Sequence, residues 1–338
     1  MLYVTTRTNK DAFTAYRAIN ENIAPDGGRF VPFRIPVLSA REIAELCSKN
    51  FGEIVADILN KFFSSRLTGW DVDFCIGRNA VRLFSMSHRI IIAELWHNPN
   101  ADYEYVVKNL QNMLLNTECA DHIPSEWTRI AIRIAVLFGL FCQLPEGALS
   151  DLDQVVDISV PADDFTMPMA AWYARRMGLP IGMIICTCED NSAVWDLIHR
   201  GVFNTAAADH DLQLGIERLI QANLGYNEVC LYREKCDKGQ VYSVSEDKLA
   251  ILSDGIFCAV VGSTRAGSII NSVFRSNSYV VDPVTALSYG GLQDYRSRTG
   301  GSRTTLLVAE NTPLAFSKEI SASTGIPANQ LTDHVNYS

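Results

Sequence analysis

From Arg89 onward, short apolar runs alternate with amphipathic stretches along the chain. Val155–Val160 and Ile181–Cys186 are mostly apolar on both faces, as strands covered by helices on both sides must be. Between such runs, apolar residues recur at helical spacing, which is typical of amphipathic helices. This alternation predicts a parallel sheet joined by right-handed crossovers, and hence an α/β fold.

The same patterns give bounds for the expected elements. Strands are predicted at Leu2–Thr6, Arg89–Ala93, Val155–Val160, Ile181–Cys186, Ile256–Val261 and Thr305–Ala309. Helices are predicted at Asp11–Asn22, Phe51–Phe63, Asp102–Leu115, Glu126–Cys142, Pro168–Met177, Ser192–Arg200, Gln213–Asn223, Ala266–Phe274, Thr285–Ser297 and Pro313–Ser323, with a short one opened by a capping box at Ser39 and ending at Cys47. The segment Arg66–Phe84 leaves room for one further short helix. We divide the chain into an N-terminal α+β domain, residues 1–88, and an α/β domain, residues 89–338.

One stretch, Glu94–Lys108, joins a predicted strand to a predicted helix through a tight His-Asn-Pro-Asn turn. The strand before it is apolar and β-branched, and Asp102 is placed to cap the helix after it. Ligands of α/β proteins bind in the crevice beyond the carboxyl ends of the strands. We therefore expect one wall of any active site at this turn.

The composition is that of a soluble globular protein, with 48% hydrophobic and 20% charged residues. A net charge of −9 and the lack of any lysine and arginine cluster argue against a nucleic acid or an anionic membrane as partner. The N-terminus has no apolar signal-peptide segment, and the longest apolar run, Ile134–Cys142, is far shorter than a membrane span. Nine cysteines without a spacing pattern fit reduced thiols, so we expect a cytoplasmic protein.

Five blocks that follow one another along nearly the whole chain resemble those of the threonine synthases. They are Tyr3–Thr6, Ala24–Pro32, Met177–Ile181, Asp211–Leu219 and Asp282–Ala286. Threonine synthases are fold-type II enzymes that use pyridoxal phosphate (PLP) to convert phosphohomoserine into threonine. The resemblance implies a sheet with flanking helices similar to that of the tryptophan synthase beta chain, an N-terminal α+β domain of the threonine synthase type, and a homodimer.

The residue that would anchor the cofactor is missing. In the family, a lysine in the motif Glu-Leu-Phe-His-Gly-Pro-Thr-x-Ala-Phe-Lys-Asp binds PLP as a Schiff base. Glu94, Leu95 and His97 match the start of this motif, but the position of the lysine holds Glu104. A carboxylate cannot form a Schiff base with an aldehyde. Lys108 lies one helical turn further on, roughly 6 Å along the axis, and is a poor replacement.

The loop that would bind the cofactor phosphate is also changed. The family uses a Gly-Asn-Phe-Gly-Asn loop, whose backbone N–H groups meet the anion at a helix start. The corresponding loop here, Val160–Met167, has no glycine and carries Asp163 and Asp164, followed by Thr166 and Met167. Each like-charge contact at about 4 Å costs roughly 1–4 kcal/mol, so the loop disfavours a phosphate. The alternative role of the two aspartates is to cap the following helix.

Two further features depart from the family. A hydroxyl that the family places beside the pyridine nitrogen, in a Thr-Ala-His-Pro-Ala-Lys-Phe block, is replaced by Glu310. The family's substrate-binding Ser-Gly-Asp-Thr-Gly loop is absent, because the chain passes almost directly from Leu115 to the helix that contains Trp127. We therefore expect a shortened member of the family, in which most of a small subdomain is deleted.

Three replacements and a deletion thus fall on the cofactor site, while the scaffold blocks remain. We interpret the chain as a threonine synthase-like pseudoenzyme with a binding, regulatory or assembly role, and we expect no PLP. One alternative is an active PLP enzyme of amino-acid biosynthesis, a carbon–oxygen lyase of the threonine synthase type, in which another lysine serves. A second alternative is a cleft that binds a new ligand.

The cleft of the second alternative consists of His97, Glu104, Asp163, Asp164 and Glu310. Carboxylates that converge in a partly dry cleft repel one another, which favours a bound cation or a small amine. The competing interpretation is a collapsed cleft, in which the acids are solvated or bound to neighbouring N–H groups and His97 keeps a structural hydrogen bond. Because no metal-ligand spacing occurs in the sequence, no metal site is predicted.

Overall fold

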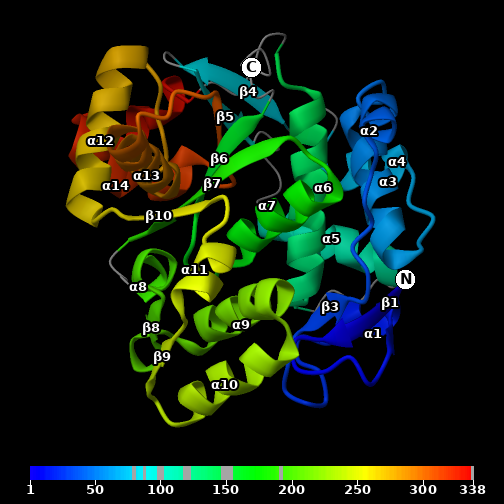
Figure 1. The fold of residues 1–338 in the computed structure, drawn as a ribbon. Helices are drawn as coiled ribbons and strands as arrows, with labels where there is room; N and C mark the ends of the chain where they lie inside the picture. Colours follow the sequence, from blue (N-terminus) through cyan, green and yellow to red (C-terminus); the bar gives the residue numbers. More distant parts are fainter. Residues whose placement is uncertain are drawn as a thin grey trace.

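The computed structural model describes residues 1–77, 81–86, 89–96, 103–116, 123–145, 155–189 and 193–335. Its centre is a six-stranded sheet in the order β10-β7-β6-β11-β5-β4 (Figure 1). The strands are β4 Arg82–Met86, β5 Ile90–Glu94, β6 Val156–Pro161, β7 Ile181–Cys188, β10 Ile256–Val260 and β11 Thr305–Ala309. Neighbours are parallel except at one edge, where β4 pairs antiparallel with β5. The predicted α/β fold is confirmed, with β4 as an additional antiparallel strand.

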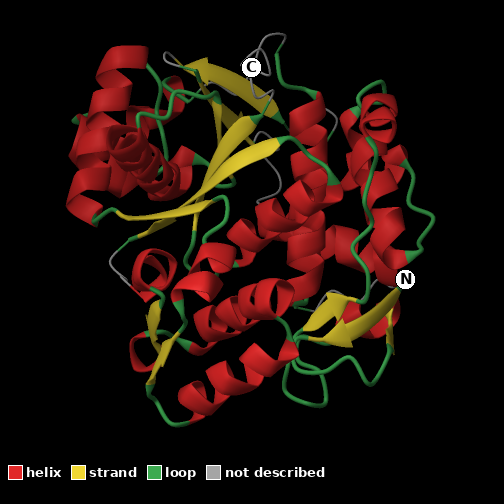
Figure 2. Cartoon of the chain, viewed as in Figure 1, coloured by secondary structure: helices red, strands yellow, loops and turns green. Residues whose placement is uncertain are grey.

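Helices cover both faces of this sheet (Figure 2). Successive residues of a strand point to opposite faces, so Ile91 belongs to one apolar core and Ile90 to the other. The first core includes α6 (Glu126–Cys142) and α7 (Thr166–Met177), and the second includes α12 (Ser263–Asn277), α13 (Pro283–Thr299) and α14 (Ser317–Thr324). Every residue of β5 and β11 is buried, which is why both strands read as nearly continuous apolar runs.

The N-terminal part contains a small antiparallel sheet in the order β2-β1-β3. Its elements are β1 Leu2–Thr5, β2 Phe13–Thr14, α1 Ala15–Asn20, β3 Phe30–Pro32, α2 Ala40–Leu46, α3 Phe51–Phe63 and α4 Gly69–Ile76. The capping box predicted at Ser39 is confirmed, with reciprocal hydrogen bonds to Glu42. The helix expected from Asp11 begins only at Ala15, because Phe13 and Thr14 pair with β1 and Thr14 caps the helix.

The remaining elements connect the strands of the main sheet or follow its last strand. They are α5 Tyr103–Leu115, α8 Ala193–Arg200, β8 Val202–Asn204, α9 His210–Leu224, α10 Tyr226–Asp237, β9 Val241–Ser243, α11 Glu246–Leu252 and the 3₁₀ turns Thr205–Ala207, Pro313–Phe316 and Ala328–Asp333. The elements β8, β9, α10 and α11 lie outside the predicted set, because they are short or, like α10, mostly polar around the helix. Within the described ranges, no helix is long and apolar enough to cross a bilayer.

The predicted domain boundary falls next to β4. This strand precedes residue 88, yet it pairs with β5 in the main sheet. The division into residues 1–88 and 89–338 stays a prediction.

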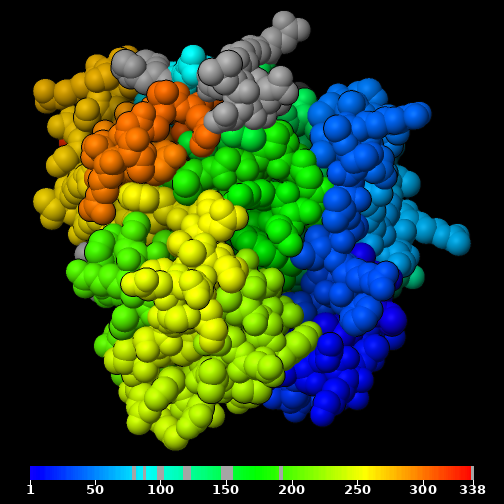
Figure 3. Space-filling view, in the orientation of Figure 1, coloured from blue at the N-terminus to red at the C-terminus, as the bar shows by residue number. Residues whose placement is uncertain are grey.

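A buried arginine joins the N-terminal sheet to the main α/β part. The Arg218 guanidinium on α9 is fully buried and donates to the carbonyl oxygen of Phe30 (2.9 Å) and to Glu126 Oε2 (2.8 Å). The preceding residue, Glu217, accepts a hydrogen bond from Arg7 Nε at 3.2 Å. Figure 3 shows the blue N-terminal segment lying against the yellow-green surface of α9 and α10. Since charges removed from water require partners, these pairs fix where the N-terminal segment docks.

A second buried charge, Asp282, caps the helix α13. Its Oδ1 accepts hydrogen bonds from the backbone N–H groups of Val284 (3.0 Å) and Thr285 (3.1 Å), and Pro283 occupies the first helical position. Burial raises the pKa of the Asp282 carboxyl to about 6, against the opposing effect of the hydrogen bonds from Thr285 and Val284.

We expect Asp282 to make the stability of the protein depend on pH. The folded state holds this proton more tightly than the unfolded chain, where an aspartate has a pKa of about 4. The stabilisation is therefore complete below pH 4 and is lost as the pH rises through 6. Relative to Asp282→Asn, which keeps the cap without a charge, the free energy of unfolding of the wild type should fall by about 2–3 kcal/mol between these limits.

Urea denaturation at several pH values between 4 and 7 measures this difference. The exposed Asp254, which pairs with Arg175 on the surface, provides the control Asp254→Asn, and its pH dependence should match the wild type. Equal pH dependence in Asp282→Asn and the wild type would show that the Asp282 carboxyl titrates normally in the fold.

Candidate functional site

The segments that correspond to the cofactor site of the family meet at the carboxyl ends of neighbouring strands. Glu310 directly follows β11, and the loop from Ala162 to Phe165 follows β6, the parallel neighbour of β11. The strand β5, which precedes α5 in the chain, is the parallel neighbour of β11 on its other side. Parallel neighbours end at the same edge of a sheet, so the topology brings these segments to one place, as expected for an α/β protein.

Arg133 of α6 connects the segments that meet at this edge of the sheet. Arg133 Nε donates to Glu310 Oε1 and Arg133 Nη2 to Glu310 Oε2, both at 2.8 Å, while Nη1 donates to the hydroxyl of Thr166. The side chains of Arg133 and Glu310 are 13% and 19% exposed. Burial lowers the pKa of the Arg133 guanidinium, but the charge and hydrogen bonds of Glu310 outweigh this effect and raise it above its ordinary value. The pair is therefore charged and bidentate.

Thr166 links this pair to the loop after β6. Asp164 Oδ1 accepts hydrogen bonds from the backbone N–H (3.0 Å) and the hydroxyl (2.7 Å) of Thr166, the first residue of α7. Asp164 thus satisfies one N–H at the helix start, in agreement with the capping role considered for it. Asp163 as a whole residue is exposed. Its carboxyl group is nevertheless partly shielded from water, and this desolvation, together with the charge of Asp164, raises the pKa of Asp163. Met167, the second residue of α7, is buried in the core.

The loop after β6 has a strained backbone. Phe165, which is completely buried, has a φ of 58° and a ψ of 8°, in the left-handed region. A residue other than glycine costs roughly 1–2 kcal/mol in this conformation. The buried ring of Phe165 is held in place by the surrounding core, which offsets the strain.

Glu104 has its own arginine. It lies near the start of α5, where its side chain is 55% exposed and pairs with Arg129 of α6. The preceding residue, Tyr103, is buried, and the Arg133 guanidinium lies 5.8 Å from the centre of its ring. The Tyr103 hydroxyl has no hydrogen-bond partner within the described part of the chain. Burial raises the pKa of Tyr103 far above its ordinary value, so this hydroxyl keeps its proton.

Four of the residues predicted to line a cleft are therefore placed as follows. Glu104 and Glu310 each pair with an arginine, Asp164 accepts from Thr166, and Asp163 is exposed. The fifth, His97, lies outside the described residues. The prediction of a cleft with unpaired carboxylates did not include Arg129 and Arg133, which pair with Glu104 and Glu310.

Arg129 and Arg133 were missing from the predicted site. They lie four residues apart on α6, a helix that is otherwise almost entirely buried and apolar after its first turn. Residues at this spacing share one helix face. Two arginines on one face of such a helix require acidic partners, and this signal was available in the sequence.

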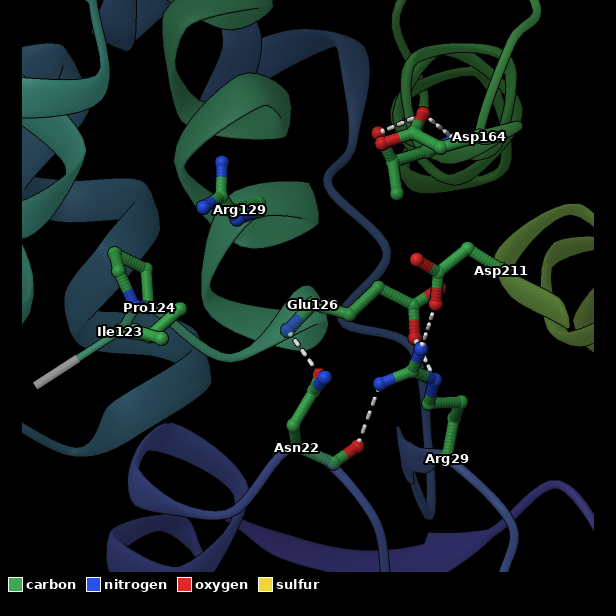
Figure 4. A pocket seen from close by; sticks show the side chains of 9 residues that line it. Asn22, Arg29, Ile123, Pro124, Glu126, Arg129, Asp164 and Asp211 are labelled. Atoms are coloured by element: carbon green, nitrogen blue, oxygen red, sulfur yellow. Dashed lines mark hydrogen bonds and ion pairs between the residues drawn. The ribbon is translucent and has the colours of Figure 1, made fainter.

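A pocket opens beside these pairs, between the start of α6, the start of α7 and the N-terminal segment (Figure 4). Its volume is about 260 Å³. The lining is mostly polar or charged and consists of Asn22, Arg29, Ile123, Pro124, Glu126, Arg129, Asp164, Thr166 and Asp211.

We expect the pair of Arg133 and Glu310 to be strongly coupled in stability. Either Arg133→Met or Glu310→Leu leaves one buried charge without its partner and should lower the free energy of unfolding by about 2–4 kcal/mol, somewhat less than for a fully buried pair. The double variant leaves no unpaired charge and should lose less than the sum of the single losses.

Urea denaturation of the four proteins measures the coupling. The exposed pair of Arg41 and Glu45 on α2 is the matched control, and the same cycle on it should give at most about 0.5 kcal/mol. Additive losses at Arg133 and Glu310 would contradict a direct interaction between them.

Comparison with known proteins gives the relationships of the chain. Residues 2–79 match the family model described as Threonine synthase N terminus. Threonine synthase-like 1 of Homo sapiens is 21% identical over 174 residues, and that of Macaca fascicularis is 24% identical over 177 residues. Each match covers 48% of this chain and 23% of the relative. The match thus spans less than a quarter of the length of these curated relatives.

Solved threonine synthases share the fold. The crystal structure of PLP-bound threonine synthase from Brucella melitensis superposes with a TM-score of 0.78 at 18% identity, covering 96% of this chain and 92% of that one. Threonine synthase from yeast gives a TM-score of 0.79 at 13% identity, covering 98% and 94%. At these identities the likeness establishes the fold alone. The N-terminal part of the chain thus matches the family model of threonine synthases, and the described chain as a whole has their fold.

Proposed function

We propose that this threonine synthase-like protein does not use PLP and has a binding, regulatory or assembly role in place of the family's catalysis. The observation that carries the proposal is the position of Arg133. Its guanidinium reaches both Glu310 and Thr166, which the resemblance assigns to the pyridine side and the phosphate side of the cofactor. This position supports the proposal, because the guanidinium of Arg133 joins the two residues that the resemblance assigns to opposite ends of the cofactor.

The residues at this place do not fit PLP. Position 104 has a carboxylate, which pairs with Arg129, so this position offers no amine for a Schiff base with the aldehyde of PLP. A cofactor between positions 166 and 310 would have to displace Arg133 and leave Glu310 without its partner. Separating a pair that is this buried is costly, because both charges would lose their partner in a place with little water.

The first alternative, an active PLP enzyme, depends on another lysine. Lys108 lies one turn after Glu104 on α5 and is half-buried. It remains the lysine to test for this alternative.

The second alternative, an acidic site for a cation, has less support. In the parts of the chain that the structure describes, no group of three or more histidine, cysteine, aspartate or glutamate side chains is placed to hold a metal ion. The arginines beside Glu104 and Glu310 also remove the repulsion that would have attracted a cation.

The loss of the cofactor predicts how the purified protein responds to PLP. One equivalent of added PLP should give no stable imine absorbance near the visible edge, because no buried amine competes with free lysines for it. Borohydride reduction followed by peptide mapping should find no lysine labelled stoichiometrically. The variant Lys108→Arg serves as the control, and its absorbance should equal that of the wild type. Stoichiometric labelling of one lysine, lost in Lys108→Arg if that residue is the anchor, would refute the proposal.

Restoring the amine alone should also fail. In Glu104→Lys, the new ammonium group would face Arg129, which now pairs with Glu104, and the pair of Arg133 and Glu310 would remain in place. Groups that act as a unit in catalysis fail together. We therefore expect no threonine from phosphohomoserine in a coupled phosphate-release assay with Glu104→Lys, with Glu104→Gln as the matched control. Turnover by the lysine variant well above that of the glutamine variant would show that the other replacements matter little.

A further inference from the structure

Two cysteines from distant parts of the chain contact each other at a place that the proposed function does not use. Cys47 directly follows α2 as its C-cap and is exposed, and Cys142 is the last residue of α6 and is half-buried. Their thiols share a hydrogen bond. Cys142 follows Arg133 by nine residues, roughly 13 Å along the helix axis, so the pair lies outside the candidate site and is independent of the proposed loss of PLP.

The packing of neighbouring residues holds the two thiols together. Gly139 lies in the last turn of α6, and a Cβ atom at this position would lie 2.5 Å from the ring of Phe51. Phe51 is the first residue of α3, so the short turn between α2 and α3 lies against the end of α6. Within this turn, the backbone N–H of Lys49 donates to the carbonyl oxygen of Leu46 at 2.9 Å. The contact between the thiols therefore follows from the arrangement of the backbone around them.

The helix α2 itself has little apolar contact with the rest of the fold. Of its seven residues only Leu46 is buried, and Ile43 is half-buried. A pocket of about 320 Å³, lined mostly by charged side chains, lies between α2 and α3. Helices that bury little apolar surface open locally at low cost in free energy. A covalent bond at Cys47 would therefore restrain a part of the chain that packing restrains only weakly.

The different exposure of the two thiols gives each a different role in thiol–disulfide exchange. A reagent in solution reaches the exposed Cys47 first. Burial, together with the contact with the Cys47 thiol, raises the pKa of Cys142 well above its ordinary value, so Cys142 stays protonated in the reduced protein. Cys142 is therefore suited to react second, with a sulfur that is already bonded next to it.

Other cysteines in the described ranges do not combine contact with exposure. The sulfur atoms of Cys188 and Cys258 lie 4.0 Å apart, but both residues are buried in the main sheet. Cys230 is exposed on α10, and its thiol makes no hydrogen bond to another thiol of the described chain.

We propose that Cys47 and Cys142 form a reversible disulfide that fixes α2 to the end of α6, with a small disulfide of the glutathione class as the oxidant. The Cys47 thiolate attacks one sulfur of glutathione disulfide and releases the first glutathione thiol. Cys142 then loses its proton and attacks the Cys47 sulfur, which releases the second. The two protein thiols lose two electrons and two protons in total, and glutathione disulfide takes them up to become two thiols.

Oxidation of the full chain with glutathione disulfide, followed by alkylation and non-reducing peptide mapping, tests the proposal. A peptide pair joined through Cys47 and Cys142 should be the main product in the wild type, and dithiothreitol should restore both thiols. The matched control Cys230→Ser, which removes an exposed thiol elsewhere, should give the same product in the same amount.

Two variants separate the roles of the thiols. In Cys142→Ser, the mixed disulfide of glutathione with Cys47 should accumulate at least about tenfold over its level in the wild type, because the thiol that displaces glutathione is gone. In Cys47→Ser, Cys142 should take up at least about tenfold less glutathione than Cys47 does in Cys142→Ser, because Cys142 is less accessible.

Hydrogen exchange measures the effect of the bond on α2. The backbone amides of residues 43–47 should exchange several times more slowly in the oxidised wild type than in the reduced protein, because the bond suppresses local opening of the helix. The same treatment should leave their exchange rates in Cys142→Ser unchanged.

Absence of the joined peptide pair after oxidation of the folded wild type would overturn the proposal. Equal accumulation of the glutathione adduct at Cys47 in the wild type and in Cys142→Ser would also overturn it. Equal exchange rates of α2 in the oxidised and reduced wild type would show that the bond does not fix this helix. All of these outcomes are separate from the PLP experiment, because none of them involves a lysine.

Discussion

The hydrogen bonds of the Arg218 guanidinium are the interactions on which the docking of the N-terminal sheet against the main α/β part depends. The guanidinium has no exposed surface, and the hydrogen bonds that Phe30 and Glu126 accept from it offset the cost of burying its charge. Phe30 belongs to the N-terminal sheet, Glu126 to the start of α6 and Arg218 to α9. A single buried charge thereby sets the relative position of three elements that are distant in the sequence.

The start of α6 is where this joint meets the candidate site. Glu126 binds Arg218 and Arg29, and the same helix presents Arg129 to Glu104 and Arg133 to Glu310 one and two turns later. The helix therefore acts as a rigid support whose charged face carries these ion pairs, while its other faces lie in the core. Because the partners come from several elements, the arrangement at the site depends on the same helix as the docking of the N-terminal segment.

Much of the fold could be predicted because local patterns determine it. Phe51–Phe63, Glu126–Cys142 and Thr305–Ala309 have the predicted bounds, since capping residues and uninterrupted apolar spacing mark their ends. The edge strand β4 has no such signal, because one face of it is only partly covered and its residues alternate irregularly. The site was harder to predict. Arg133 and Glu310 are 177 residues apart, and nothing local to either indicates that they meet.

Several residues in the blocks that resemble the family have structural roles. Asp282 caps α13, Asp211 pairs with Arg29, and Glu217 and Arg218 hold the N-terminal segment, and none of these roles involves a cofactor. Positions 104, 164 and 310, where the sequence departs from the motifs of the family, have partners within the chain.

The pair of Arg133 and Glu310 also limits which substitutions the protein tolerates at this place. A substitution of either residue alone leaves the buried charge of the other without its partner. Each single step thus leads through a less stable protein, and natural proteins have only about 5–15 kcal/mol of stability in reserve. Single substitutions at this pair are therefore disfavoured, whereas exposed residues around it can change at little cost in stability.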